Sequence, residues 1–213
     1  MKLLEFLALT LLLSLFTYTT YAFSNSLLAS VAVKSNTEST SEVNNDAKTK
    51  LPENSLYQIK SEWQNQDSER MQLKDLAGKK QIVSLIYTHC QHTCPIIVEN
   101  MKMVDKSIPD NKKHEYAFVL ISLTPETDTP EVLKQFAQDR KLDNKRWTLL
   151  RGDEKDVHLL AMALETEYKK IANNEVSHSN LISILDEQGQ IMLQAKGTSD
   201  QALTLIKKIQ AIK

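Results

Sequence analysis

The strongest constraint on the fold is a series of nearly continuous apolar runs that alternate with helical patterns after residue 54. The runs Ile82 to Ile86 and Ala117 to Leu123 are each interrupted only by a serine. Strands that are apolar on both sides suit the centre of a sheet that is covered by helices on both faces. The body of this chain is therefore expected to contain a sheet with buried central strands.

Shorter patterns complete the expected domain. Pro130 marks the start of a helix whose cap is Asp128 or Thr129, and Asp153 precedes an apolar stripe at helical spacing. Further strands and turns are predicted at Leu56 to Trp63, Gln66 to Arg70, Trp147 to Leu150, and in a hairpin of Leu181 to Leu185 and Ile191 to Leu193 around Asp186 to Gly189. This order predicts an α/β fold with a mixed sheet flanked by helices and closed by an antiparallel hairpin, which fits a thioredoxin-like architecture.

The N-terminus has the pattern of a targeting segment. Lys2 precedes the apolar run Leu3 to Thr17, and small residues follow up to Ala22, in the order of a secretory signal. The run is shorter than the roughly 20 residues that span a membrane comfortably. We therefore expect residues 1–22 to be a signal peptide or a retained membrane anchor, and the body to be exported to the periplasm or the outer face of the inner membrane.

The next segment, residues 23–54, is expected to be a flexible tether, because its polar stretch from Lys34 to Asn54 has almost no large apolar residue. The folded domain is then expected to occupy residues 55–213. The chain carries 26 Lys and Arg against 27 Asp and Glu, a formal net charge of −1. Such a balance, without a clustered basic face, argues against a nucleic-acid partner.

The only two cysteines, Cys90 and Cys94, lie in a loop between a predicted buried strand and a helix. Pro95 suits the first helical turn, so the helix N-terminus is expected to stabilise nearby thiolates. A structural disulfide in so small a loop would contribute only about 2 kcal/mol. Redox exchange and metal binding are therefore both favoured over a structural disulfide.

The five histidines differ in their surroundings. His178 stands in a predicted loop before the hairpin, and His114 and His158 are interpreted as surface residues. His92 lies between the cysteines, where it is either a further ligand, a basic group that lowers a cysteine pKa, or a solvated residue. Met101 and Met103 look like a soft metal-binding pair, but Met101 falls on the apolar stripe of its helix and is expected to pack in the core.

Three ordered motifs carry a resemblance to the Sco/SenC family, which spans roughly Ser55 to Gly197. They are Tyr87-Thr88-His89-Cys90 with Cys94-Pro95, the segment Ser122 to Pro130, and Val176-Ser177-His178-Ser179. The resemblance implies a thioredoxin-like, exported or membrane-tethered metallochaperone that binds copper through Cys90, Cys94 and His178. It also implies that the copper-bearing subunit of cytochrome c oxidase is the partner, through assembly of its binuclear copper centre.

Departures from the family pattern accompany this resemblance. Gln91 and His92 replace the usual residues after the first cysteine, Thr124 replaces an aspartate, and Asp128 serves either as a helix cap or near the metal loop. The main alternative is a thiol–disulfide oxidoreductase that uses Cys90 and Cys94 on exported copper or thiol proteins, without obligate copper. Zinc also suits two Cys and one His, whereas a thiol peroxidase is disfavoured because no proline precedes Cys90 in its strand or loop.

Overall fold

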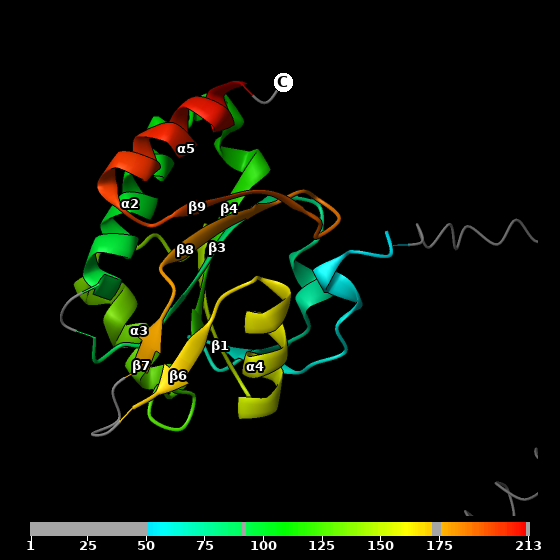
Figure 1. Ribbon diagram of the computed structural model, residues 1–213, viewed down its shortest axis with the longest axis vertical. Helices are drawn as coiled ribbons and strands as arrows, with labels where there is room; N and C mark the ends of the chain where they lie inside the picture. The colour runs from blue at the N-terminus through cyan, green and yellow to red at the C-terminus, as the bar shows by residue number, and fades with distance from the viewer. Residues whose placement is uncertain (1–50, 91–92, 172–175, 212–213) are drawn as a thin grey trace, which may run out of the picture. The chain divides into compact units, whose positions relative to one another are not determined.

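A seven-stranded mixed sheet forms the centre of the protein, with its strands in the order β2-β1-β5-β4-β3-β8-β9. The computed structural model describes residues 51–90, 93–171 and 176–211 (Figure 1). The three middle strands β3 (Lys80–Ile86), β4 (Tyr116–Ser122) and β5 (Trp147–Gly152) run parallel to one another. Nearly every residue of β3 and β4 is buried, which confirms the interpretation of their continuous apolar runs.

Antiparallel strands complete both edges of the sheet. On one side β8 (Leu181–Leu185) pairs with β3 and then turns into β9 (Ile191–Lys196). On the other side β1 (Trp63–Asn65) pairs with β5 and with the short edge strand β2 (Arg70–Met71). The predicted mixed sheet with a closing hairpin is therefore confirmed.

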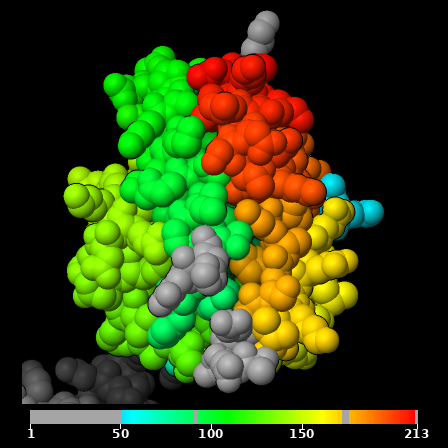
Figure 2. All heavy atoms as spheres, turned by 60° about the vertical axis from the view of Figure 1, so that its left-hand side comes forward, coloured from blue at the N-terminus to red at the C-terminus, as the bar shows by residue number. Residues whose placement is uncertain are grey.

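Helices cover both faces of this sheet. Residues of α2 (Thr93–Ser107), α3 (Pro130–Asp139) and α5 (Ser199–Ala211) belong to one buried cluster, and residues of α4 (Glu154–Ala163) belong to a second cluster. Helices α2 and α5 lie side by side, green and red in Figures 1 and 2. Since each cluster packs against the sheet, the strand β3 is buried on both faces. The chain passes from the C-terminal end of β3 to the helix α2.

The strand expected from Leu56 to Trp63 is wrong over most of its length. Leu56–Gln58 form a 3₁₀ helix, capped by the Ser55 side chain, which accepts a hydrogen bond from the backbone N–H of Tyr57. Leu56 and Tyr57 are both buried, whereas neighbouring residues of a half-buried strand would face opposite sides. The backbone N–H of Leu56 donates to the carbonyl of Gly189, so a distant turn fixes this conformation.

A two-stranded ribbon of β6 (Tyr168–Lys170) and β7 (Val176–His178) was not predicted. Its antiparallel register places Tyr168 directly opposite His178. The prediction that His178 lies in a loop is therefore wrong, because it is the last residue of β7. The ribbon holds His178 beside Cys94 in the first turn of α2.

The predicted signal or anchor at residues 1–22 lies outside the described residues, as does most of the predicted tether. Within the described ranges, none of the helices has the length and apolar character that crossing a membrane requires. The proposed start of the folded domain at residue 55 stays a prediction.

Candidate metal centre

The two cysteines lie where β3 passes into α2. The backbone N–H of Cys90 donates to the carbonyl of Tyr87 at 3.2 Å, which turns the chain directly after the strand. Helix α2 begins at Thr93, so Cys94 is in its first turn rather than in the loop before it. The N–H of Cys94 donates to the Sγ of Cys90 at 3.4 Å. This contact brings the two thiols to one end of the helix.

His178 reaches the same place from a distant part of the chain. Its Nε2 lies 3.8 Å from the Sγ of Cys94, and its Nδ1 lies 3.1 Å from the carbonyl oxygen of Ser179. Because a carbonyl only accepts hydrogen bonds, Nδ1 carries the proton and the lone pair of Nε2 faces the sulfur. Burial lowers the pKa of His178, which keeps the imidazole neutral at pH 7.

Tyr87 supports both sides of this site. Its ring meets the His178 ring edge-on, with the centroids 6.3 Å apart and the planes at 79°. Burial, followed by the interaction of its hydroxyl with the Cys90 thiol, raises the pKa of Tyr87 to about 12. Tyr87 therefore stays a neutral hydroxyl that helps to orient the imidazole and one sulfur.

The expectation that the helix N-terminus stabilises the thiolates is wrong for Cys94. Burial, as the largest cause, raises the pKa of the Cys94 thiol to about 12, and its side chain is 0% exposed. Loss of solvation disfavours the charged form more than the helix end favours it. Cys94 is consequently a thiol at pH 7, and a metal ion that binds to its sulfur would replace that proton.

Asp128 connects the loop before Cys90 to the end of β4 through hydrogen bonds. Its side chain is 0% exposed and accepts hydrogen bonds from the hydroxyls of Thr88, Ser122 and Thr124 at 2.5, 2.6 and 3.0 Å. The backbone N–H of Thr88 also donates to it, at 3.3 Å. The cap of α3 is Thr129, which accepts from the N–H of Val132. Of the two roles left open for Asp128, the structure thus supports the one beside the metal loop.

Thr124 fits this network in place of an aspartate. Its backbone N–H donates to the Ser122 hydroxyl at 3.0 Å, and its own hydroxyl donates to Asp128. An aspartate at position 124 would place a second carboxylate beside that of Asp128, which now accepts a hydrogen bond from the Thr124 hydroxyl. The hydroxyl instead satisfies the buried carboxylate of Asp128.

The other candidate ligands are not gathered at the site. His89 is exposed, with its Nδ1 3.9 Å from an oxygen of Asp128, and His114 and His158 are exposed on other elements. Met101 is buried in the core as predicted, whereas Met103 is 41% exposed, so these two do not form a soft pair. His92 lies outside the described residues, and its proposed roles stay predictions.

The donor set is suited to a soft metal ion. With metal–sulfur and metal–nitrogen bonds of about 2.3 and 2.0 Å, two ligands of one ion lie roughly 3.5–3.7 Å apart. The separation of 3.8 Å between Cys94 Sγ and His178 Nε2 is close to this range. In the part of the chain that is described, no three His, Cys, Asp or Glu side chains already form a closed metal site. The Cys94–His178 pair therefore has a spacing close to that of two ligands of one ion, and Cys90 Sγ accepts a hydrogen bond from the backbone N–H of Cys94 beside it.

A buried cysteine pair at the start of a helix, in a sheet of this topology, defines a thioredoxin-like protein with a histidine beside the thiols. The family model described as SCO1/SenC matches residues 50–213. The chain belongs to the SCO1/SenC family, as the three motifs indicated.

Individual relatives agree with this assignment. The SCO1 protein homolog of Bacillus subtilis is 23% identical over 158 residues, which cover 71% of this chain and 81% of the relative. A SCO1/SenC family lipoprotein from Bacillus anthracis superposes with a TM-score of 0.64 at 28% identity, covering 71% of this chain and 91% of that one. Arabidopsis thaliana ScoI, solved with copper bound, has a TM-score of 0.62 at 21% identity over 71% of this chain and 96% of its own.

Proposed function

We propose that this protein is a copper metallochaperone whose cargo binds to Cys90, Cys94 and His178. The observation that supports this most directly is the approach of His178 Nε2 to Cys94 Sγ at 3.8 Å, across 84 positions of sequence. Two thiolates and an imidazole are soft and intermediate donors that suit Cu(I) and also hold Cu(II). A solved relative of the same fold contains copper, which supports this metal over zinc.

The state of the thiols favours copper binding over dithiol exchange alone. Attack on a disulfide requires a thiolate, and burial raises the pKa of the Cys94 thiol to about 12. A metal ion removes this obstacle because it displaces the proton as it binds. The neutral imidazole whose Nε2 faces the sulfur also supplies a third metal ligand, which a protein that acts only in thiol–disulfide exchange does not require.

The proposed recipient is the copper-bearing subunit of cytochrome c oxidase, to which this protein delivers copper or whose thiols it prepares. Export through residues 1–22 would place the domain on the same side of the membrane as that subunit. A flexible tether of the length proposed for residues 23–54 would span about 30 Å on average. Such a reach would let a domain anchored through residues 1–22 meet a membrane-bound partner.

A strain that lacks the gene for this protein can distinguish copper delivery from thiol–disulfide exchange. We expect loss of the oxidase copper centre, measured by its absorption and by copper content, with recovery on expression of the wild-type chain. The variants Cys90→Ser, Cys94→Ser and His178→Ala should not restore it, whereas His114→Ala should. Full restoration by His178→Ala, or by an external thiol reductant without added copper, would instead indicate a thiol–disulfide reductase.

A further inference from the structure

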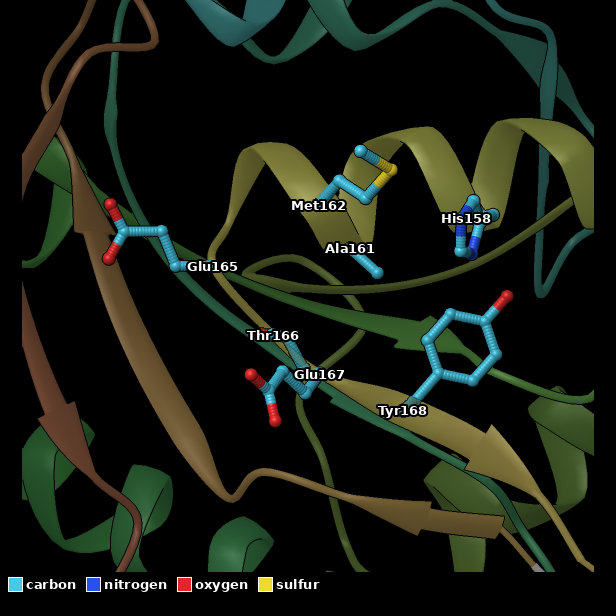
Figure 3. Close-up of a pocket in the computed structure, with 7 residues that line it drawn as sticks. All are labelled: His158, Ala161, Met162, Glu165, Thr166, Glu167 and Tyr168. Atoms are coloured by element: carbon cyan, nitrogen blue, oxygen red, sulfur yellow. The ribbon is translucent and has the colours of Figure 1, made fainter.

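A second pair of soft donor atoms lies on α4. His158 and Met162 are four residues apart on this helix, so they occupy neighbouring positions on one face. In Figure 3 both side chains project from the same side of the helix, and the sulfur of Met162 is turned towards His158. An imidazole nitrogen and a thioether sulfur are thereby placed one helical turn apart.

Both residues line a pocket of about 520 Å³, which extends to Glu165, Thr166, Glu167 and Tyr168. Met162 is 63% exposed, although methionine usually fills gaps in a core. The Tyr168 ring meets the His158 ring at 65° with the centroids 5.7 Å apart, so an aromatic edge holds the imidazole in place. The two donors are consequently accessible to a small ion, and one of them is oriented.

The electrostatic surroundings favour a cation. Met162 is the penultimate residue of α4, where the negative end of the helix dipole attracts positive charge. Glu165 and Glu167 add two carboxylates to the lining of the pocket. The ammonium group of Lys170 forms ion pairs with Glu126 and Glu154, at 3.0 and 2.8 Å. The carboxylates of Glu165 and Glu167 are thus not neutralised by Lys170 and can attract a cation to the pocket.

The backbone at the end of α4 places an acidic residue where glycine is preferred. Glu165 has a φ of 53°, and the helix closes through hydrogen bonds from Glu165 N to Met162 O and from Thr166 N to Ala161 O. This closing motif usually has glycine at the left-handed position. The left-handed conformation of Glu165 therefore carries a cost in backbone conformation, and in Figure 3 its carboxylate points away from Met162 and His158.

We propose that His158 and Met162 form a second, weaker binding site, which takes Cu(I). Thioether sulfur selects soft ions such as Cu(I), and an imidazole nitrogen and a thioether sulfur bring no negative charge to the ion, so it is held less tightly than by a pair of thiolates. Tyr168, which contacts His158, lies opposite His178 in the β6–β7 ribbon. The second site is thereby joined to the metal centre through one short ribbon. The assignment is independent of the function proposed for the cysteines.

The test uses the full chain in a Cys90→Ser/Cys94→Ser background, where the cysteine site is removed. Cu(I) is added without oxygen against a chromophoric competitor, and the methionine methyl groups are followed by NMR. We expect weak uptake of one Cu(I), with a shift of the Met162 methyl signal, and loss of both in His158→Ala and in Met162→Leu. The matched controls His114→Ala and Met103→Leu change an exposed histidine and an exposed methionine elsewhere and should retain the uptake.

Two further outcomes decide the proposal. Glu165→Gly should weaken Cu(I) uptake severalfold while it raises the unfolding temperature, because it removes a carboxylate and relieves the backbone. Equal uptake by Met162→Leu and its parent, or a Met162 methyl signal that does not move, would overturn the second site. All of these experiments use protein that lacks Cys90 and Cys94. A negative result would therefore overturn the second site without contradicting the function proposed for the cysteines.

Discussion

Replacing Asp128 by Asn is expected to loosen the metal loop while the overall fold is retained. The Asp128 carboxylate accepts hydrogen bonds from the hydroxyls of Thr88, Ser122 and Thr124 and from the backbone N–H of Thr88. Asparagine has nearly the same shape but offers one uncharged acceptor oxygen. The bonds to Thr88 matter most for function, because Thr88 lies two residues before Cys90.

The size of the effect follows from these bonds. A hydrogen bond to a charged group contributes about 1.5–3 kcal/mol, against about 0.5–1.5 kcal/mol for a neutral one. Each of the four described bonds to Asp128 should therefore lose about 1–1.5 kcal/mol, so that the free energy of unfolding falls by up to about 4–6 kcal/mol. Groups that orient metal ligands typically change metal affinity by 10–100-fold, and we expect a loss of Cu(I) affinity in that range.

The assay combines urea unfolding with Cu(I) competition titrations at a temperature where every variant is folded. Thr88→Val should reduce Cu(I) affinity more than Thr124→Val does, because only Thr88 belongs to the loop. Asp153→Asn is the control, since Asp153 precedes α4 without a side-chain capping bond. An Asp128→Asn protein within about 0.5 kcal/mol of wild-type stability, or with unchanged Cu(I) affinity, would refute the reasoning.

Other expectations follow from burial and backbone geometry. Burial lowers the pKa of His178 from 6.5, so the folded state disfavours its charged form and stability should fall as the pH drops below about 6.5. Urea unfolding at pH 5 and 7 should show a smaller loss for His178→Gln, and an equal loss would contradict this. Burial raises the pKa of Cys94 from 9.0 to about 12, so apo stability should decline between these values, and Cys94→Ala should remove that decline. Gly189→Ala should cost more than Gly78→Ala in thermal unfolding, because only at Gly189 would a Cβ meet a ring, that of Tyr57 at 2.7 Å, and equal losses would exclude this cause. Limited proteolysis should cut within residues 23–54 before the folded domain, and resistance there would move the domain boundary.

The parts of the fold that the sequence predicted well are those in which burial is continuous. The strands β3 and β4 are apolar on both faces, so their runs allow little other than a central position in a sheet. The segment from Leu56 was mistaken for a strand because its conformation depends on the carbonyl of Gly189, far along the chain. Strands of three residues, such as β7, are too short to show a period of two.

The structure brings His178 beside Cys94, two residues that the sequence analysis had singled out, but the protonation of the thiol could not be predicted from the sequence. The spacing around Cys90 and Cys94 indicated a thiol site, and the family resemblance indicated His178. The protonation of Cys94 depends on burial by segments distant in sequence, which no local pattern reveals. Asp128 could be assigned only when the structure showed Thr129 as the helix cap. The pair His158 and Met162 was missed because His158 was interpreted as a lone surface residue.

The most direct test of the account is Cu(II) binding by the reduced protein and its His178→Ala variant. The wild-type chain should bind one Cu(II) with a sulfur-to-copper charge-transfer band and with nitrogen coupling in its EPR spectrum. His178→Ala should lose the nitrogen coupling and bind Cu(II) far more weakly, while its two sulfurs still hold Cu(I), and His114→Ala should behave as wild type. Unaltered Cu(II) affinity and spectra in His178→Ala would contradict the assignment of His178, and equal binding by protein with an oxidised Cys90–Cys94 pair would remove the cysteines from the site.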